Sequence, residues 1–505
     1  MEKFNKLSLL FGFLIISLSF VSAVPQLTIH SPENITYDSN KILVNVTSNE
    51  PVDFYMASPS NSRIPPSLLA ENTTSFESFV YVKNGSYKFD IFANNSNGET
   101  SENITFSTTA HNPINITDCG ILMASNTEYV LGQDILSTFY GCIQLREMRN
   151  STFNLMGHVI DTNPRRYALT IWYSSDIMLF NGTIKTPASS GSDFWGTLML
   201  YGTKLTLENL TIEGSIGIDI ESMKSSVIRN VTINSSVGIF SMDAYDLYIV
   251  DSDINWNGVF SPIYGTAAFV DYSSTHSTVI LEESNMTGFP DYNFYLEGSF
   301  IDFYLRSSHI NISKAHYPDW VSDARFFTQH LVIVNISDQF NLTGACSVQV
   351  LDNGVLPRLE GIDAKLKTLA NPTAKVYIPT GETGRGQEWI TEKLIYAKSS
   401  SPVVIEEYDF SNYTLTTKGW GAENYSQIIL DLTGLNSTIE VDFKINTSLG
   451  KTQELPECTT LQMLDLNNDE NVNILDATIV LRYIAGLPVS SAGTKECAGI
   501  SLNAF

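Results

Sequence analysis

The chain has 505 residues, enough for roughly three or four domains. It carries 29 Lys and Arg against 54 Asp and Glu, a formal net charge of -25, so it lacks the basic surface that nucleic-acid binding requires. Charged residues are only 16% of the chain, and the abundance of Asn, Ser, Thr, Tyr and Gly favours β structure with polar turns over helical bundles.

Residues 1–23 have the organisation of a signal peptide. Lys3 and Lys6 precede an apolar run over 7–21, and a small-residue site ends at Ala23, where we expect cleavage. The alternative is an uncleaved membrane anchor, for which the run is short. No later segment is long enough to cross a bilayer, so the sequence predicts an extracellular protein, secreted or associated with the cell surface.

About twenty N-x-S/T sequons agree with export and predict a glycoprotein. A chance surplus in an Asn-rich chain is the alternative. They include Asn34, Asn45, Asn72, Asn103, Asn181, Asn209, Asn230, Asn285, Asn341 and Asn436.

The chain has five cysteines, and in an exported protein most should pair. Two local pairs are expected, Cys119 with Cys142 and Cys458 with Cys497. Each would close a short loop and contribute roughly 3 kcal/mol by restricting the unfolded chain. Cys346 is left over and is interpreted as a small buried hydrophobe.

Residues 24–110 alternate apolar and polar residues in short runs, separated by the turns SPEN, SNEP, KNGS and NNSNGE. This spacing predicts a β-sandwich. The SPENITY opening followed by VNVTSNEPVDFY resembles immunoglobulin-like modules of secreted microbial surface proteins, which implies a spacer or binding module.

A different pattern occupies residues 111–345. LTLENLTI, SVIRNVTI and LYIVDSDI each place a polar residue three positions before a final Ile, and these polar residues are 21 residues apart. The same pattern extends in both directions with longer intervals. The polar positions are Gly157, Asn181, Asn209, Asn230, Asp251, Glu283, Ser307 and Asn335.

This period, with β-branched residues at every second position, predicts a right-handed parallel β-helix and excludes α-solenoids and leucine-rich repeats. Asn181, Asn209 and Asn230, with Asn335 as a further candidate, are expected in tight turns where Asn tolerates left-handed geometry and stacks in amide ladders. The segment DCGILMASNTEYVLGQDILSTFYGCIQL resembles the capping segment of pectin-lyase-like β-helix proteins, which implies that a Cys119–Cys142 bridge covers one open end.

Residues 346–450 are expected to form a second β-sandwich. CSVQVLDNGVLPRLEGIDAKLKTL and the strand-like runs after it resemble carboxypeptidase-regulatory-like modules, which implies a spacer or stiffening role.

Residues 451–505 contain the sharpest motif, an acidic 12-residue loop followed by the helical pattern ATIVLRYIAGLP. Ca²⁺ prefers six to eight oxygen ligands, and an EF-hand-type loop places them at alternating positions. An unliganded acidic turn is the alternative. The expected Ca²⁺ ligands are Asp465, Asn467, Asp469, Asn471, Asn473 and Asp476.

The same stretch resembles a dockerin repeat, whose partner is a cohesin. The resemblance departs from the family in two ways: Glu470 replaces the usual Gly, and only one repeat is present instead of two. The family's cohesin-facing positions correspond to Ile474, Leu475 and Arg482. Ca²⁺ and the Cys458–Cys497 bridge would stabilise a module too small to build its own core.

Catalysis is possible on a β-helix, but no catalytic motif is recognisable. The scattered histidines, His158, His276, His309 and His330, suggest no metal site or triad. Candidate acid, base or cation-binding residues are Asp219, Arg229, Asp243, Asp246, Asp251, Asp253, Asp271, His316, Asp319, Asp323 and Arg325.

Aromatic residues on successive coils could stack on sugar rings where they point outward, and the alternative is that they pack under loops. The candidates are Trp172, Tyr173, Trp195, Tyr201, Tyr245, Tyr248, Trp256, Tyr264, Tyr292 and Tyr304. We therefore expect a surface adhesin or carbohydrate-binding protein whose partner is a polysaccharide or surface glycan. The alternative is a polysaccharide lyase or glycoside hydrolase that a dockerin-like tail recruits to a cohesin-like protein.

Overall fold

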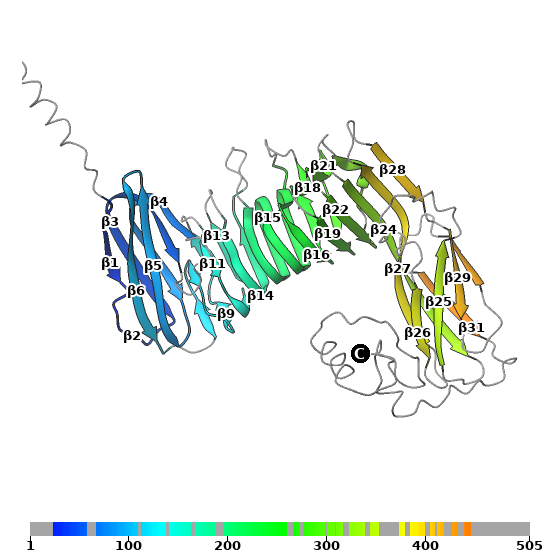
Figure 1. The fold of residues 1–505 in the computed structure, drawn as a ribbon, viewed down its shortest axis with the longest axis horizontal. Helices are drawn as coiled ribbons and strands as arrows, with labels where there is room; N and C mark the ends of the chain where they lie inside the picture. Colours follow the sequence, from blue (N-terminus) through cyan, green and yellow to red (C-terminus); the bar gives the residue numbers. More distant parts are fainter. Residues whose placement is uncertain are drawn as a thin grey trace, which may run out of the picture. The chain divides into compact units, whose positions relative to one another are not determined.

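The computed structural model is an all-β protein (Figure 1). The residues it describes are 24–57, 67–109, 113–137, 141–162, 167–187, 196–259, 266–272, 276–297, 300–308, 310–316, 323–338, 344–352, 373–378, 384–398, 404–409, 412–418, 427–431 and 439–445. Within these ranges, no helix is long and apolar enough to cross a membrane. The chain divides into two compact units, 1–328 with 394–407, and 329–393 with 408–505.

The first unit begins with six strands that enclose their own apolar core. They are β1 (Leu27–Ser31), β2 (Thr36–Tyr37), β3 (Lys41–Ala57), β4 (Ser67–Tyr81), β5 (Gly85–Asn95) and β6 (Gly98–Thr108). β3 pairs antiparallel with β1, β4 and β5, and β5 pairs antiparallel with β6. Alternate residues such as Val44, Val46, Phe54 and Ile91 are buried, as the period-2 pattern predicts. The immunoglobulin-like assignment remains a prediction.

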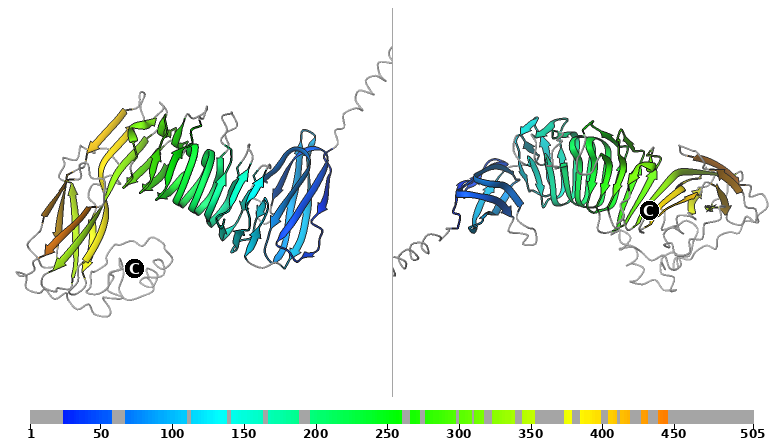
Figure 2. Two further views of the ribbon diagram at one scale, coloured as in Figure 1. Left: turned by 180° about the vertical axis from the view of Figure 1, so that it is seen from behind. Right: turned by 90° about the horizontal axis from the view of Figure 1, so that it is seen from above.

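The middle of the chain is a parallel β-helix of about seven turns, which confirms the prediction from the 21-residue repeat (Figures 1 and 2). Each turn adds one strand segment to each of three parallel sheets. The first sheet contains β8 (Gly120–Leu122), β11 (Ile143–Arg146), parts of β14 (Leu169–Lys185) and β15 (Gly196–Ser241), β18 (Ala267–Asp271), β21 (Tyr292–Leu296) and β23 (Ala315–His316).

The other two sheets continue from the same strands. The second contains β9 (Glu128–Leu131), β12 (Arg149–Asn154), parts of β14 and β15, β16 (Ala244–Val250), β19 (His276–Glu282), β22 (Phe300–Arg306) and β24 (Asp323–Asp338). The third contains β10 (Ile135–Ser137), β13 (Val159–Thr162), parts of β14 and β15, β17 (Asp253–Trp256) and β20 (Asn285–Thr287). A 3-10 turn, η1 (Ile312–Lys314), follows β22.

The predicted asparagine ladder is present at the turn between the second and third sheets. Asn181, Asn209 and Asn230 have φ values of 60°, 52° and 50°, the left-handed region that Asn tolerates. Each amide donates to Oδ1 of the residue one turn below, at 3.5 Å from Asn181 to Asn154, 3.3 Å from Asn209 to Asn181 and 2.6 Å from Asn230 to Asn209.

The same turn continues beyond the asparagines. Asp251, Glu283 and Ser307 also have φ values between 47° and 49°, so the forward extension of the repeat holds through three more turns. Asn335, by contrast, lies within β24, and its backbone pairs with Asp442 of β31 (Ile439–Ile445).

A buried serine ladder follows these turn residues, and the sequence analysis did not anticipate it. The Ser252 hydroxyl accepts from the backbone N–H of Val231 at 3.2 Å and donates to its own turn at Val250 O. Ser284 and Ser308 repeat the arrangement on the next two turns. The ladder satisfies buried backbone groups where the chain turns a corner.

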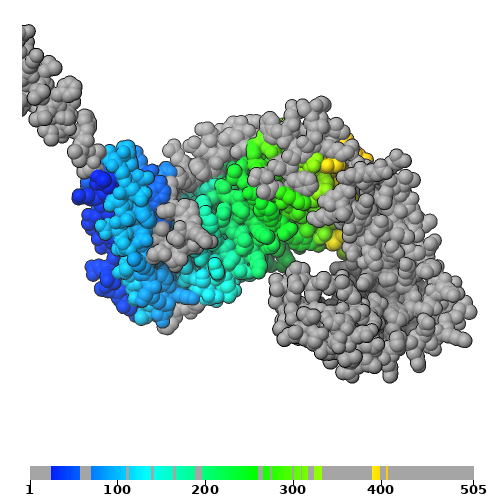
Figure 3. Space-filling view, viewed as in Figure 1, coloured from blue at the N-terminus to red at the C-terminus, as the bar shows by residue number. Residues whose placement is uncertain are grey.

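The N-terminal end of the β-helix is covered by the preceding module. β4 pairs in parallel with β8, and β7 (Ile114–Ile116) pairs with β9. A Cβ on Gly120 would lie 2.5 Å from the carbonyl oxygen of Phe79, so only glycine fits this close approach. The space-filling view shows the N-terminal residues in contact with the first rungs (Figure 3).

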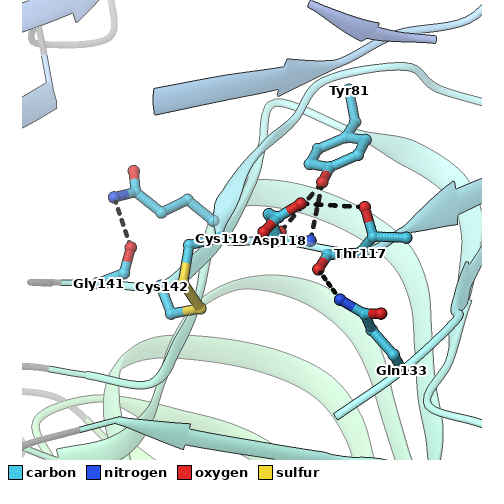
Figure 4. Close-up of a disulfide and its surroundings, with 8 residues drawn as sticks. Tyr81, Thr117, Asp118, Cys119, Gln133, Gly141 and Cys142 are labelled. Carbon is cyan, nitrogen blue, oxygen red and sulfur yellow. Dashed lines mark hydrogen bonds between the residues drawn. A yellow bond between two sulfur atoms is a disulfide. The ribbon is translucent and has the colours of Figure 1, made fainter. Parts of the chain in front are cut away.

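The predicted Cys119–Cys142 disulfide is confirmed, and it links the first two rungs just before β8 and β11 (Figure 4). Nearby, the Tyr81 hydroxyl donates to the Asp118 carbonyl at 3.1 Å, and the backbone N–H of Asp118 donates to the same hydroxyl. The end of the solenoid is therefore held by a covalent bond, by strand pairing and by this tyrosine contact.

The second unit contains an antiparallel sheet in the order β26 (Thr373–Ile378), β25 (Gly344–Asp352), β29 (Asn412–Lys418) and β30 (Gln427–Asp431). Cys346 lies in β25, opposite Val376. β27 (Gly384–Lys398) and β28 (Val404–Asp409) each have residues in both units. The carboxypeptidase-regulatory-like assignment remains a prediction.

Candidate functional site

The outer face of the first sheet carries two columns of side chains over three rungs. In β11, Ile143 and Leu145 belong to the solenoid core, so the residues that alternate with them point outward. The registers of β11, β14 and β15 continue both columns. We call these six residues the proximal grid: Gln144, Thr170 and Met199 in one column, and Arg146, Trp172 and Tyr201 in the other.

The proximal grid contains an aromatic stack. The rings of Trp172 and Tyr201 lie 6.1 Å apart between centroids, with planes inclined by only 19°. Tyr173, at the register shift between β14 and β15, has a φ of 48° and places its ring 4.4 Å from that of Tyr201. All three side chains are half-buried, so part of each ring meets solvent.

Arg146, in the same column, is 6% exposed although it points out of the solenoid. Its Nη2 donates to Oε1 of Gln144 at 2.5 Å, and its Nε has no partner in the described part of the chain. Burial lowers the pKa of Arg146 to about 9, while the neighbouring negative charge of Glu147 acts in the opposite direction.

Further along this sheet, a buried carboxyl group faces outward. Asp219 and Phe240 are separated by 21 residues, the spacing of the repeat, as are Gly217 and Gly238. A Cβ on Gly217 would lie 2.7 Å from the carbonyl oxygen of Gly238, which agrees with Asp219 occupying the position that Phe240 occupies one turn later. Asp219 is 6% exposed, and its Oδ2 accepts from the Tyr167 hydroxyl at 2.5 Å, while Oδ1 has no partner among the described residues.

Burial raises the pKa of Asp219 to about 7, although the hydrogen bond from Tyr167 lowers it and the charge of Glu221 raises it further. Glu221 lies two residues along the chain, and burial raises the pKa of its carboxyl as well. Asp219 can therefore be a neutral carboxylic acid near neutral pH.

A second aromatic group lies on the far rungs of the first sheet. Strand register places Phe240, Val270, Tyr295 and His316 in one column. The His316 ring lies 4.9 Å from both Tyr292 and Tyr295. We call the half-buried aromatic residues of this region the distal stripe: Phe240, Tyr272, Tyr292, Tyr295 and His316. The four residues other than His316 pack over the apolar residues Ile216, Val237, Ala267 and Val270.

The other predicted acid and base residues are not brought together. Asp246 and Asp251 are exposed turn residues with positive φ, and Asp253 accepts from the Asn285 amide at 3.0 Å on the third sheet. Asp271 is buried at the end of β18, and Arg229 is exposed. Asp243 lies in the turn before β16, and Asp319 lies outside the described residues.

Arg325 is held in an ion pair that explains its burial. It donates to both carboxylate oxygens of Asp302, at 2.5 Å and 2.9 Å, and His276 contacts the same carboxylate at 3.1 Å. Asp302 and Arg325 are both nearly inaccessible to solvent. Asp323 accepts from the Tyr396 hydroxyl at 2.9 Å. These contacts join the last rungs and do not form an open catalytic site.

The remaining aromatic and histidine candidates are dispersed. Tyr304 is buried against Phe327, with centroids 4.8 Å apart, and Trp256 donates to the Val259 carbonyl on the third sheet. The Tyr248 hydroxyl contacts Glu282 on the second sheet, and Tyr245 lies near the start of β16. His158 contacts Asp134 and His330 contacts Glu392, whereas Trp195, Tyr264 and His309 lie outside the described residues.

The predicted calcium loop, its cohesin-facing residues and the Cys458–Cys497 bridge all lie beyond residue 445, outside the described residues. In the part of the chain that is described, no group of three or more His, Cys, Asp or Glu side chains could hold a metal ion. The Ca²⁺ site therefore remains a prediction from the loop sequence.

Sequence reasoning missed Arg146, Tyr167, Phe240 and Tyr295. Arg146, Phe240 and Tyr295 sit at positions that alternate with core residues of a rung, and this alternation marks them as outward, whereas Tyr167 precedes β14. Burial of an outward position depends on what covers that face, and a period-2 pattern carries no such information.

No protein-family model matches the chain, and no curated protein matches it. Among solved structures, the chain is similar to the tailspike protein gp49 from Pseudomonas phage LKA1. The identity is 9% over 78% of this chain and 82% of that chain, with a TM-score of 0.16. The assignment of a β-helix rests on the strand registers described above and not on this likeness.

Proposed function

We propose that this chain is an extracellular carbohydrate-binding protein of the adhesin type, whose glycan lies along the outer face of the first sheet. The observation that supports the proposal is the gathering of half-buried aromatic rings on one sheet, in the proximal grid and again in the distal stripe. Rings that keep one face in solvent can stack on the apolar face of a sugar.

The periodicity of the sheet suits an extended polymer. Neighbouring rungs of a parallel sheet are separated by roughly 4.8 Å, so residues in one column repeat at a fixed interval along the solenoid axis. A polysaccharide running along this axis would meet the Trp172–Tyr201 stack first and the Tyr295–His316 pair several rungs later.

Affinity electrophoresis of the full chain against a broad panel of neutral and acidic polysaccharides tests the proposal. Trp172→Ala and Tyr295→Ala should each weaken retardation by roughly five- to tenfold, because a stacked ring is removed. Trp256→Ala is the matched control, since Trp256 lies on the third sheet. If no polysaccharide retards the wild type, or if all three variants lose retardation equally, the result would count against glycan binding on this face.

The terminal segments supply the proposed location and attachment. The signal peptide and the sequons support an extracellular, glycosylated protein, and the dockerin-like loop supports Ca²⁺-dependent attachment to a cohesin-like partner. Loss of attachment on adding a chelator would support this part of the proposal independently of glycan binding.

A second candidate function, glycan cleavage, is favoured by one observation. Asp219 is an outward carboxyl group that lies on the same sheet as both aromatic groups and accepts a hydrogen bond from Tyr167. A carboxylic acid that stays protonated near neutral pH can serve as a general acid, and Glu221 is its nearest candidate partner. New reducing ends that disappear in both Asp219→Asn and Glu221→Gln, and persist in Asp251→Ala, would establish this activity.

A further inference from the structure

Arg146 is a buried cation without an anionic partner among the described residues. Among the described residues, no carboxylate oxygen lies within the 4.0 Å that defines an ion pair with its guanidinium group. Among these residues, its side chain donates one hydrogen bond, to the neutral amide of Gln144. Burying an unpaired charge is strongly unfavourable, so such a residue usually has a partner that completes the site.

Arg325, another buried arginine of this fold, differs from Arg146 because its charge is neutralised by a carboxylate. Arg325 is 4% exposed, close to the 6% of Arg146, and two hydrogen bonds to the Asp302 carboxylate satisfy its charge. Arg146 has no equivalent of Asp302 among the described residues. Glu147 is adjacent in sequence and half-buried, and its charge acts on Arg146, but it lies beyond ion-pair distance.

The surroundings of Arg146 resemble a binding site, because they contain polar groups that a ligand could hydrogen-bond. Thr170 is opposite Gln144 on the next rung, and its buried hydroxyl has no partner within the described ranges. Trp172 is opposite Arg146 and begins the aromatic stack. A cation, a hydroxyl, an amide and an aromatic ring are thus collected on two adjacent rungs.

We infer that the proximal grid recognises an anionic sugar, with Arg146 binding its carboxylate or sulfate group while the sugar ring stacks on Trp172. This inference rests on the proposed glycan-binding function and names the class of ligand. The planar guanidinium group suits two-point contact with an oxyanion, and the Trp172 ring supplies the apolar surface that a sugar face requires.

The test compares four polymers on the full chain by biolayer interferometry: polygalacturonate, its fully methyl-esterified form, dextran sulfate and dextran. The wild type should bind polygalacturonate or dextran sulfate ten- to hundredfold more tightly than its neutral counterpart, because a charge-assisted contact is made. Preference for one of the two acidic polymers identifies carboxylate or sulfate as the group recognised.

Arg146→Gln should abolish this preference, and Arg149→Gln is the matched control. Arg149 is an exposed arginine three residues away, so its loss changes the net charge equally and should alter binding less than twofold. Equal binding of acidic and neutral polymers, or equal losses in the two variants, would overturn the role of Arg146 while leaving glycan binding intact. Failure of the broad polysaccharide panel would instead remove the proposed function itself.

A stability measurement separates recognition from a structural role. If the charge of Arg146 is neutralised only by a bound ligand, the ligand-free Arg146→Gln variant should melt at the same temperature as the ligand-free wild type or higher, because an uncompensated charge is removed. The acidic polymer that binds should then raise the melting temperature of the wild type but not of the variant. A variant that melts several degrees lower and still binds acidic polymers with full preference would overturn the inference.

Discussion

Nδ2 of Asn230 donates a hydrogen bond to Oδ1 of Asn209 at 2.6 Å, and Asn209 makes the same contact with Asn181 one turn below. All three asparagines begin N-x-T sequons. The atom that would carry a glycan is therefore the atom that links the turns. A glycan on Nδ2 would crowd the neighbouring rung, which lies roughly 4.8 Å away.

We predict that Asn181, Asn209 and Asn230 stay largely unmodified in a glycosylating host. Asn103 is the control, because it is an exposed sequon asparagine in the N-terminal module. Glycopeptide mass spectrometry should find Asn103 occupied. High occupancy at Asn209 or Asn230 would show that the ladder does not protect these side chains.

The ladder also contributes to stability, and Asn209→Ala should lower it by roughly 1–3 kcal/mol. The substitution removes two amide contacts and places alanine at a φ of 52°, which costs about 1 kcal/mol. Asn209→Gly keeps the backbone conformation accessible and should lose less than Asn209→Ala. Urea denaturation would measure both, and equal losses would assign the whole effect to the ladder contacts.

These turns show how far the sequence predicts this fold. The uninterrupted spacing of Asn209, Asn230 and Asp251 predicts the register, because a solenoid of constant rung length must repeat its turn chemistry. Ser252 and Ser284 follow the same register, but serine in an Asn-rich chain looks like ordinary turn composition, so their burial was not predicted. Only three-dimensional stacking shows that their hydroxyls bond backbone groups of adjacent rungs.

The face proposed to bind glycan was predicted in outline only. Trp172, Tyr173 and Tyr201 are among the aromatic candidates for sugar stacking, and they form one stack. Arg146 was not anticipated, because a sequence pattern reports the side of a strand and not whether that side is covered. Arg325 was predicted as a candidate base, but Asp302, twenty-three residues earlier, neutralises it.

The Cys119–Cys142 bridge should be a substantial part of the stability of the N-terminal rungs. It spans a sequence separation of 23 residues, so its removal is expected to destabilise this end by roughly 3 kcal/mol. Cys119→Ser with Cys142→Ser should therefore increase amide hydrogen exchange in β8 and β11. An exchange pattern equal to that of the wild type would mean that strand pairing with β4 alone holds this end.

Calcium should stabilise the region from Cys458 to Cys497, because three of the six expected oxygen ligands, Asp465, Asp469 and Asp476, are carboxylates that repel one another without a cation. Adding a chelator should increase hydrogen exchange over this region and leave the solenoid unchanged. Asp465→Asn and Asp469→Asn should reproduce the effect without chelator. Exchange that is insensitive to both treatments would argue for an unliganded turn.

Asp219 should make the stability of the solenoid depend on pH. Its pKa in the folded chain is about 7, above the ordinary value of 3.8, so the folded state holds this proton more tightly than the unfolded state. The stabilisation is complete below about pH 4 and is lost as the pH rises towards 7. The expected loss between pH 4.5 and pH 8 is on the order of 2–4 kcal/mol.

Asp219→Asn removes this titration, so its unfolding midpoint in urea should fall less between pH 4.5 and pH 8 than that of the wild type. A smaller slope should remain, because burial also raises the pKa of Glu221. Asp246→Asn is the control: Asp246 is an exposed turn residue with a φ of 53° that asparagine tolerates, so this variant should keep the wild-type pH dependence. Asp219→Asn and Asp246→Asn could instead both show the wild-type change in urea midpoint between pH 4.5 and pH 8. Asp219 would then already be ionised at pH 4.5 in the folded chain. That result would contradict both its contribution to the pH dependence of stability and its proposed role as a general acid.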